Sequence, residues 1–244
     1  MKSPFIYKEK STIFFGDAAH CPDNFRDSNI LEERNSTILT NYCEGFAQKH
    51  SLTNVAILDQ VHGVDSLVVG KNTLQKRVTV CEQKGDFLIT NQSSIALGVI
   101  TGDCLPVVVY DKKNHAVGIA HAGWKGTVAG VVPVMVQAMK SNYGTQSGDV
   151  TIWFGPAARP CCYEVQQDFV AAIAHLSDQE KFLIKRDEKL FFDGTACNET
   201  LLTPVGIQSA SLDTSYNVCT ICAPGYYSHR RKSFARQVSF VWII

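Results

Sequence analysis

Three short segments of the sequence each place a side chain capable of metal binding or nucleophilic chemistry at or beside the end of an apolar run. These side chains are His62 in DQVHGVD, Cys104 in TGDCLPV and His121 in AHAGWKG. A glycine lies within two residues of each, so the backbone there can turn sharply or approach a bound group closely. The three positions lie far apart in the sequence, unlike the closely spaced ligands of zinc fingers. If they act together, the fold must bring them together.

Two imidazoles and one thiolate form a ligand set that suits a single Zn²⁺, and copper is also compatible with these ligand types. Three protein ligands leave the fourth position open for water or substrate, which is the arrangement of a catalytic zinc site. The same residues have two other interpretations. Buried histidines and cysteines also occur as ordinary core side chains, and Cys104 with His121 or His62 as its base forms the pair needed for acyl transfer.

Two aspartates adjoin these segments and are candidates for orienting a ligand histidine from behind. Asp103 directly precedes Cys104, and Asp86 follows Gly85 at the start of a strand-like run. A capping or turn role is the alternative for both, and for Asp86 the preceding glycine favours it.

Basic side chains near the motifs are candidates for binding an anionic part of a substrate. Lys125 follows Trp124, and Arg230 and Arg231 follow aromatic residues in YYSHRR. Guanidinium groups beside aromatic rings suit a phosphate or a stacked base. Ordinary solvated surface charge is the alternative for all three. The remaining histidines have no comparable setting: His20, His50, His115, His175 and His229.

The nine cysteines are an odd number in a chain whose first residues, MKSPFIYKEKS, lack the apolar core of a secretory signal. We therefore expect reduced thiols and no disulfide framework. Cys219 and Cys222 form a lone CxxC without a second pair, which is weak evidence for a metal site. Cys161 and Cys162 are adjacent and would point in different directions on an extended chain, so we expect them to pack in the core.

The charge balance excludes several classes of partner. With 23 basic and 23 acidic residues the formal net charge is zero, so no overall field attracts nucleic acid or anionic lipid. An apolar run of 18 residues, as a transmembrane helix needs, is absent from the sequence. We expect a cytoplasmic protein without a nucleic-acid or membrane partner, and no feature predicts a protein partner.

The apolar patterns predict an α+β fold in one domain over residues 1–244, with packed sheets and helices outside. Near-continuous, β-branched runs predict strands covered on both faces, and ARQVSFVWII predicts a terminal strand. Longer patterns predict helices over 126–144, with Pro133 near its start or at a kink, over 166–182, and over about 195–206. Residues 1–50 give no clear pattern. The predicted strands are 55–62, 65–70, 86–90, 94–103, 105–111, 116–123 and 150–156.

Five motifs together closely resemble a family once called multicopper polyphenol oxidases or laccase-like proteins and now described as zinc-dependent purine nucleoside phosphorylases with adenosine deaminase activity. The motifs are QVHG, TGDCLPVVV, HAGWKGT, GPAARPCCYEV and YYSHRR with SFVWI. The resemblance runs from about residue 55 to the C-terminus. It implies that His62, Cys104 and His121 are zinc ligands, and it implies a mixed β-sandwich with surrounding helices, related to a cysteine-dependent toxin fold.

The resemblance also implies a set of activities on purine nucleosides. These are phosphorolysis of adenosine, inosine, guanosine and methylthioadenosine, and deamination of adenosine to inosine, with nucleosides and phosphate as the partners. Lys125, Arg230 or Arg231 would hold the phosphate. Copper-dependent oxidation of phenols is disfavoured, because one site with two histidines and one cysteine does not supply the multicopper cluster that oxygen reduction needs.

The sequence departs from the family pattern near its N-terminus. The family carries a loop resembling Ser-Arg-x-Gly-Gly-Val-Ser, whereas residues 13–30 read IFFGDAAHCPDNFRDSNI. If that loop holds phosphate or sugar, its absence affects substrate choice or activity while leaving the zinc site intact. Two alternative functions therefore stay open: a cysteine or metal hydrolase that edits peptidoglycan precursors, as described for some bacterial relatives, and a catalytically degenerate nucleoside-binding module.

Overall fold

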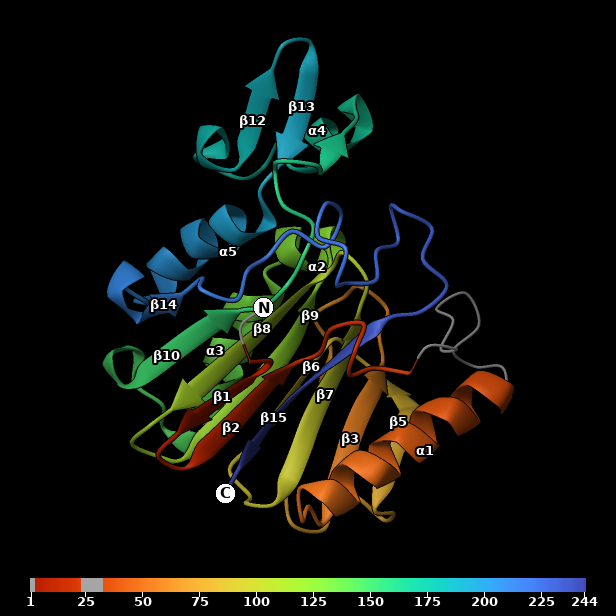
Figure 1. Cartoon of the computed structure of the whole chain (residues 1–244). Helices are drawn as coiled ribbons and strands as arrows, with labels where there is room; N and C mark the ends of the chain where they lie inside the picture. Colours follow the sequence, from red (N-terminus) through yellow and green to blue (C-terminus); the bar gives the residue numbers. More distant parts are fainter. Residues whose placement is uncertain (1–2, 23–32) are drawn as a thin grey trace.

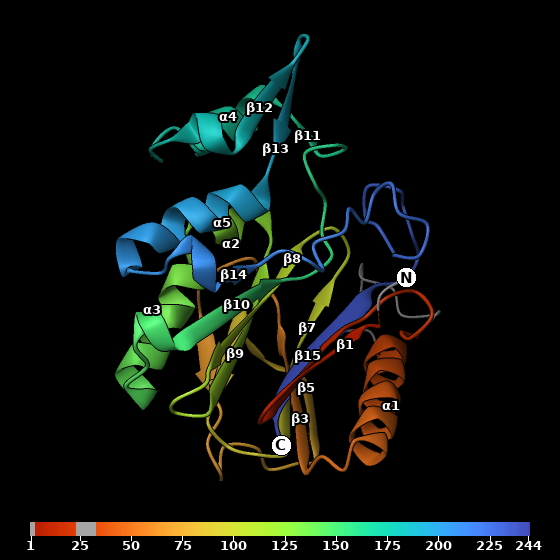
Figure 2. The ribbon, with the colours of Figure 1, turned by 60° about the vertical axis from the view of Figure 1, so that its left-hand side comes forward.

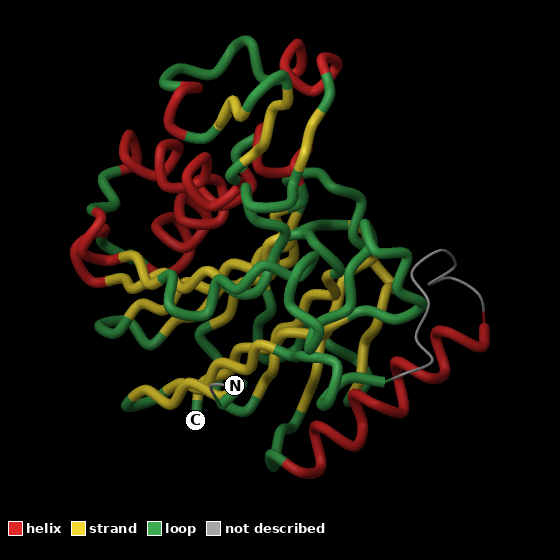
Figure 3. The backbone as a smooth tube through the Cα atoms, turned by 45° about the horizontal axis from the view of Figure 1, so that its top comes forward, coloured by secondary structure: helices red, strands yellow, loops and turns green. Residues whose placement is uncertain are grey.

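Two six-stranded mixed sheets lie face to face at the centre of the fold (Figure 1). The structure is a computed structural model and describes residues 3–22 and 33–244. Helices cover the outer faces of both sheets, so that strands form the inner layers and helices the outer ones (Figure 3). This arrangement confirms the predicted α+β fold class.

The first sheet has the order β1-β2-β15-β7-β3-β5. Neighbours from β1 to β7 pair antiparallel, and β3 pairs parallel with both β7 and β5. The predicted terminal strand therefore lies in the middle of a sheet. The bounds are β1 (Phe5–Lys8), β2 (Ser11–Phe15), β15 (Gln237–Ile243), β7 (Ile95–Thr101), β3 (Asn54–Asp59) and β5 (Val78–Lys84).

The second sheet has the order β14-β10-β8-β9-β6-β4. Its four central strands pair antiparallel, and the short strands at its edges pair parallel with their neighbours. The bounds are β14 (Leu212–Asp213), β10 (Val150–Phe154), β8 (Leu105–Asp111), β9 (Ala116–Ala122), β6 (Phe87–Thr90) and β4 (Ser66–Val68).

The core consists of apolar side chains between the sheets and under the helices. Leu97, Ile119 and Trp153 are buried between the two sheets. Outside the first sheet packs α1 (Glu33–Lys49), and outside the second pack α3 (Val131–Tyr143) and α5 (Gly194–Leu202). Burial on both sides explains why β7, β8 and β9 are apolar along their whole length, as predicted.

A small lobe projects beyond one end of the sheets (Figure 2). It contains a three-stranded sheet of order β11-β13-β12 and the short helix α4 (Gln167–Ala172). Phe169, Ile173, Phe182 and Phe192 form its buried core, against which Trp124 packs. The strands are β11 (Glu164–Val165), β12 (Leu183–Arg186) and β13 (Lys189–Phe192).

The predicted strands are present, but the helices differ in extent. The helix predicted over 126–144 is two helices, α2 (Trp124–Val128) and α3, because Gly130 adopts a left-handed conformation with φ of 80° between them. Pro133 lies in the first turn of α3, as predicted. The stop at Gly144 is a left-handed C-cap with φ of 70°.

The helix predicted over 166–182 is wrong beyond Ala172. Asp178 has a left-handed backbone with φ of 56°, and the side-chain amide of Gln179 donates to the carbonyl oxygens of Ile173 and Leu176. These side-chain bonds satisfy carbonyl groups that a continuing helix would have paired. The helix predicted near 195–206 appears as α5 followed by a 3₁₀ turn over Thr203–Val205.

The N-terminal segment contributes β1, β2 and α1, none of which the sequence pattern predicted. Of the divergent segment 13–30, residues 23–30 lie outside the described residues. Within the described part of the chain, the helices are too short or too polar to cross a membrane.

Candidate metal centre

The fold brings His62, Cys104 and His121 together. Their ligand atoms all lie within 4.8 Å of one another. The Cys104 Sγ lies 3.8 Å from His62 Nε2, and the two imidazole rings meet edge to face with centroids 4.7 Å apart. Three residues that are far apart in the sequence therefore form one potential ligand set.

Strand pairing and unusual backbone angles position the three ligands. Pro106 of β8 pairs with His121 of β9, which places Cys104, just before β8, beside the end of β9. His62 follows β3 and has a φ of 62°, and Asp103 before Cys104 has a φ of 87°. Non-glycine residues seldom adopt such angles, and they concentrate at functional sites where surrounding contacts hold them.

Gly123 makes room for the ligands. A Cβ atom at this position would lie 2.5 Å from His62 Cδ2 and 3.2 Å from Cys104 Sγ. The first distance is far below a normal contact, so any larger residue would displace the His62 ring. The glycine noted in AHAGWKG is thus required by the close approach of two ligand side chains.

Asp86 makes hydrogen bonds to two of the potential ligand residues, His62 and His121. Its Oδ1 lies 2.8 Å from His121 Nδ1, and its carboxylate accepts the backbone N–H groups of Val61, His62 and Gly63. Burial raises the pKa of Asp86, but the bonds from His121 and from these N–H groups bring it below its usual value. A carboxylate on Nδ1 directs Nε2 of His121 toward the other ligands.

The electrostatics favour a charged Cys104. Burial raises the pKa of this thiol, but the charge of His121 and hydrogen bonds from both histidines lower it to about 6. Burial also lowers the pKa of His121, yet the Cys104 thiolate and Asp86 raise it to about 9. Without a metal, Cys104 and His121 form a thiolate and imidazolium pair near neutral pH.

These ligands lie at a pocket of about 410 Å³, a volume in the range of small-molecule sites. Trp124, Tyr163 and Phe192 contribute aromatic walls, and Arg230 contributes a guanidinium group. The Arg230 guanidinium carbon lies 4.9 Å from the centre of the Tyr163 ring. The pocket therefore combines flat apolar surfaces with a cation and a potential metal centre.

The structure separates the predicted basic residues. All three side chains are exposed, and of the three only Arg230 lines the pocket. Lys125 Nζ lies 5.7 Å from the Trp124 ring, and the Arg231 guanidinium donates to the Tyr226 carbonyl oxygen. Of the three predicted basic residues, the structure thus places only Arg230 at the pocket.

Asp103 holds loops together. Its carboxylate accepts the hydroxyl groups of Thr220 and Ser228 at 2.6 and 3.0 Å and the backbone N–H of Arg230 at 2.7 Å. Its carbonyl oxygen accepts the N–H of Ala158. Asp103 therefore joins the turn before Cys104 to the loops that carry Arg230 and the far side of the pocket.

Sequence reasoning missed His229, Arg236 and Tyr163, all of which line the pocket. Arg236 is buried, and its Nη2 lies 3.2 Å from His229 Nδ1. His229 had no distinctive local setting, because its role depends on a loop that returns to the site. Tyr163 is the aromatic residue that follows the cysteine pair in CCYEV, and its position there is the only local feature that marks it.

The donor atoms fit a metal ion. Two imidazole nitrogens and one sulfur suit zinc or another borderline metal. In a tetrahedral site with a zinc–sulfur bond of about 2.3 Å and a zinc–nitrogen bond of about 2.0 Å, sulfur and nitrogen lie about 3.5 Å apart, and Cys104 Sγ and His62 Nε2 are 3.8 Å apart. The buried Asp86 supplies the carboxylate that commonly supports a ligand histidine.

Solved structures share this fold. The hypothetical protein YfiH of Bacillus licheniformis superposes with a TM-score of 0.83 over all of both chains at 23% identity. YlmD of Geobacillus stearothermophilus gives a TM-score of 0.80 over 99% of both chains at 21% identity. At these identities the likeness concerns the fold.

Sequence comparisons identify the family as well as the fold. A protein of Clostridium acetobutylicum named purine nucleoside phosphorylase is 27% identical over 96% of this chain and 92% of its own length. One of that name from Bacteroides thetaiotaomicron is 31% identical over 87% of this chain and 79% of its own length. The model of the family described as multi-copper polyphenol oxidoreductase laccase matches residues 24–244. The chain belongs to this laccase-like family, whose resemblance the motifs had indicated.

Proposed function

We propose that the protein is a zinc-dependent purine nucleoside phosphorylase that also deaminates adenosine. The observation that carries the proposal is the convergence of His62, Cys104 and His121 at a pocket with aromatic walls and a guanidinium group. The names of the relatives support the substrate class of purine nucleosides and phosphate. One domain over residues 1–244 would carry the whole site.

In this proposal the metal is zinc, because two histidines and one cysteine with an open position suit a catalytic zinc site. When bound, zinc supplies a Lewis acid with one open position that polarises an oxygen of the substrate or of water. A single set of two histidines and one cysteine does not provide the cluster that multicopper oxidases need. In this proposal Asp86 fixes the His121 ring, and Asp103 fixes the loops around the ligands.

The chain's own side chains divide the remaining tasks. Trp124 and Tyr163 line the pocket, and in this proposal they contact the purine, while Arg230 provides charge-assisted donors for phosphate. Phosphorolysis leaves a purine that needs a proton. Because an arginine only donates, the contact from Arg236 makes Nδ1 of His229 an acceptor and leaves the proton on Nε2. In this proposal that N–H donates a hydrogen bond to the departing base, and the proton that the base needs comes from the hydrogen phosphate that attacks the sugar.

Product analysis tests the proposal. The pure protein, loaded with one equivalent of zinc per site, is incubated with adenosine and phosphate, and the products are separated by chromatography. We expect adenine and ribose-1-phosphate, together with inosine or hypoxanthine from deamination. The absence of all three purine products would contradict the proposal. Nucleoside binding without turnover would indicate a degenerate binding module.

A second candidate is a thiol hydrolase, such as one acting on peptidoglycan precursors. It is favoured by the 3.8 Å separation of Cys104 Sγ and His62 Nε2, the reach of a nucleophile and its base. Iodoacetamide distinguishes the two functions. A thiol hydrolase stays active after chelation and loses activity on alkylation of Cys104, whereas a zinc enzyme loses activity on chelation and its zinc protects Cys104.

A further inference from the structure

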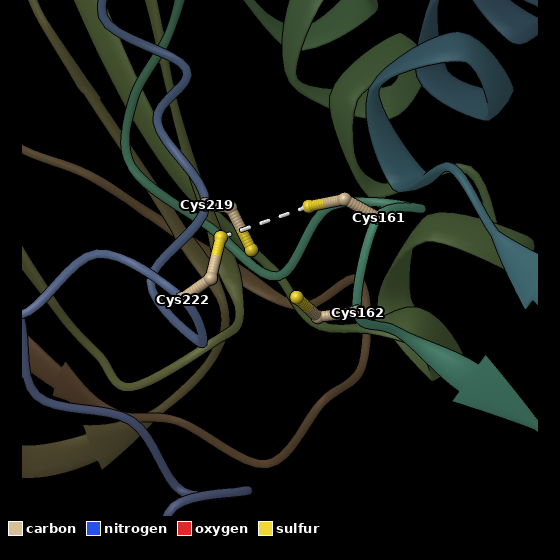
Figure 4. Close-up of side chains that lie close together, drawn as sticks. All are labelled: Cys161, Cys162, Cys219 and Cys222. Atoms are coloured by element: carbon tan, nitrogen blue, oxygen red, sulfur yellow. Dashed lines mark hydrogen bonds between the residues drawn. The ribbon is translucent and has the colours of Figure 1, made fainter.

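Four cysteines gather at a second place, outside the candidate metal centre (Figure 4). Cys161 and Cys162 lie in the turn after β10, and Cys219 and Cys222 form the CxxC of a later loop. Their sulfur atoms all lie within 4.8 Å of one another. The prediction that Cys161 and Cys162 pack separately in the core is therefore wrong. The fold supplies the second pair that the lone CxxC lacked in sequence.

Backbone pairing holds the two segments in register. Ala157 pairs with Cys219, its N–H donates to Val218 at 3.0 Å, and its carbonyl oxygen accepts the N–H of Thr220 at 2.9 Å. The turn is closed by N–H groups of Cys162 and Tyr163, which donate to the Arg159 carbonyl oxygen. The two cysteine pairs therefore face each other because of the fold.

One sulfur–sulfur separation in the cluster matches the edge of a tetrahedral metal site. Zinc–sulfur bonds of about 2.3 Å set the sulfur–sulfur edge of a tetrahedron at about 3.8 Å. Cys161 Sγ and Cys222 Sγ are 3.9 Å apart. That separation is far longer than a disulfide bond of about 2.05 Å, and all four thiols are free.

Backbone groups also contact one sulfur of the cluster. N–H groups of Cys222, Arg159 and Ile221 donate to the Cys219 sulfur. A neutral thiol accepts such hydrogen bonds only weakly. A metal-bound sulfur carries negative charge, which these N–H donors stabilise.

We propose that Cys161, Cys162, Cys219 and Cys222 bind a zinc ion as a four-thiolate structural site. Four protein ligands fill the coordination sphere, so this site holds structure and leaves no position for a substrate. The proposal is independent of the function proposed above.

The cysteine cluster lies beside the loops that form one wall of the pocket. Tyr163, directly after Cys162, lines the pocket, and Thr220, directly after Cys219, donates to Asp103 beside Cys104. A metal that ties these loops together would hold one wall of the pocket against the candidate metal centre. Its loss should loosen that wall and lower the stability of the protein.

Metal content in a Cys104→Ala background tests the proposal, because this variant removes a ligand of the other site. We expect one tightly bound zinc per chain by mass spectrometry of the metal. Adding Cys219→Ser and Cys222→Ser should remove it and lower the melting temperature. Adding Cys81→Ser, a partly buried thiol outside the cluster, is the matched control and should leave the zinc in place.

Cobalt provides a readout that does not depend on the folding of the cluster variants. Metal-stripped Cys104→Ala protein, titrated with Co²⁺ under reducing conditions, should develop the visible bands of tetrahedral cobalt and strong sulfur-to-cobalt charge transfer. An octahedral cobalt spectrum, or zinc that survives loss of Cys219 and Cys222, would overturn the proposal. So would disulfides among the four cysteines in protein purified with zinc and without reductant.

Discussion

His121 and Asp86 form a buried hydrogen bond of 2.8 Å between Nδ1 and Oδ1. The same carboxylate accepts the N–H of His62 at 2.9 Å. One aspartate therefore orients the ring of one potential ligand and the backbone of another. It follows that the geometry of the metal centre depends on a residue that does not belong to the ligand set.

Replacing Asp86 should weaken metal binding while the three ligands remain. We expect Asp86→Asn to reduce zinc affinity about 10- to 100-fold, as loss of a carboxylate behind a ligand histidine commonly does. Competition with a chromogenic chelator measures the affinity. Asp111→Asn is the control, because Asp111 is also buried and bonded to backbone N–H groups but lies away from the site. Equal affinities in both variants would refute the role of Asp86.

Enlarging Gly123 should disrupt the centre by steric contact. Its φ of −64° suits alanine, so Gly123→Ala adds only the Cβ that would press on His62 and Cys104. We expect one tightly bound zinc per chain fewer than in the wild type, with retention of the circular dichroism spectrum. Gly148→Ala has no atom within 4 Å of the added Cβ and should bind zinc normally. Normal zinc binding by Gly123→Ala would show that the ligands lie elsewhere.

The stability of the metal-free protein should depend on pH through Cys104 and His121. The pKa of Cys104 falls from 9.0 to about 6, so its contribution is present at alkaline pH and is lost as the pH falls through about 6. The pKa of His121 rises from 6.5 to about 9, so its contribution is present at acidic pH and is lost as the pH rises through about 9.

Both groups are therefore charged in the metal-free fold between about pH 6 and pH 9. Urea unfolding of chelated wild type and Cys104→Ser across the pH range measures this. The difference in the free energy of unfolding should grow as the pH rises through about 6, where Cys104 ionises in the folded protein. A difference that stays constant with pH would mean that the pair is not charged.

Arg230 should matter for phosphate and Arg231 should not. Arg230 lines the pocket, while the Arg231 guanidinium donates to a carbonyl oxygen of its own loop. A charge-assisted hydrogen bond contributes about 1.5–3 kcal/mol, so Arg230→Ala should lower kcat/KM for phosphate about 10- to 100-fold. Arg231→Ala should change it less than twofold. Equal effects of the two substitutions on kcat/KM in steady-state kinetics would contradict the proposed difference between Arg230 and Arg231.

Local sequence patterns predicted the strands because burial on both faces leaves continuous apolar runs, as in β7, β8 and β9. They overextended α4 because the side chain of Gln179 ends the helix through contacts that no periodicity records. They also missed α1, although Leu39, Cys43, Phe46 and Ala47 on its buried face follow helical spacing.

Local sequence patterns likewise predicted only part of the candidate metal centre and of the cysteine cluster. His62, Cys104 and His121 each follow a recognisable local signal, a ligand beside a glycine at a strand end, and the fold brings them together. His229 and the cysteine cluster carry no such signal. Their settings arise when the segments before Tyr163 and after Val218 pair through Ala157 and Cys219, a long-range contact.

Zinc content of the wild type beside His62→Ala tests the central claim most directly. His62→Ala removes one ligand, and His175→Ala, an exposed histidine in another loop, serves as the control. After growth with zinc and removal of loosely bound metal, we expect His62→Ala to hold one zinc per chain fewer than the wild type, with His175→Ala unchanged. Equal zinc in all three proteins would contradict the assignment of His62, Cys104 and His121 as a metal centre.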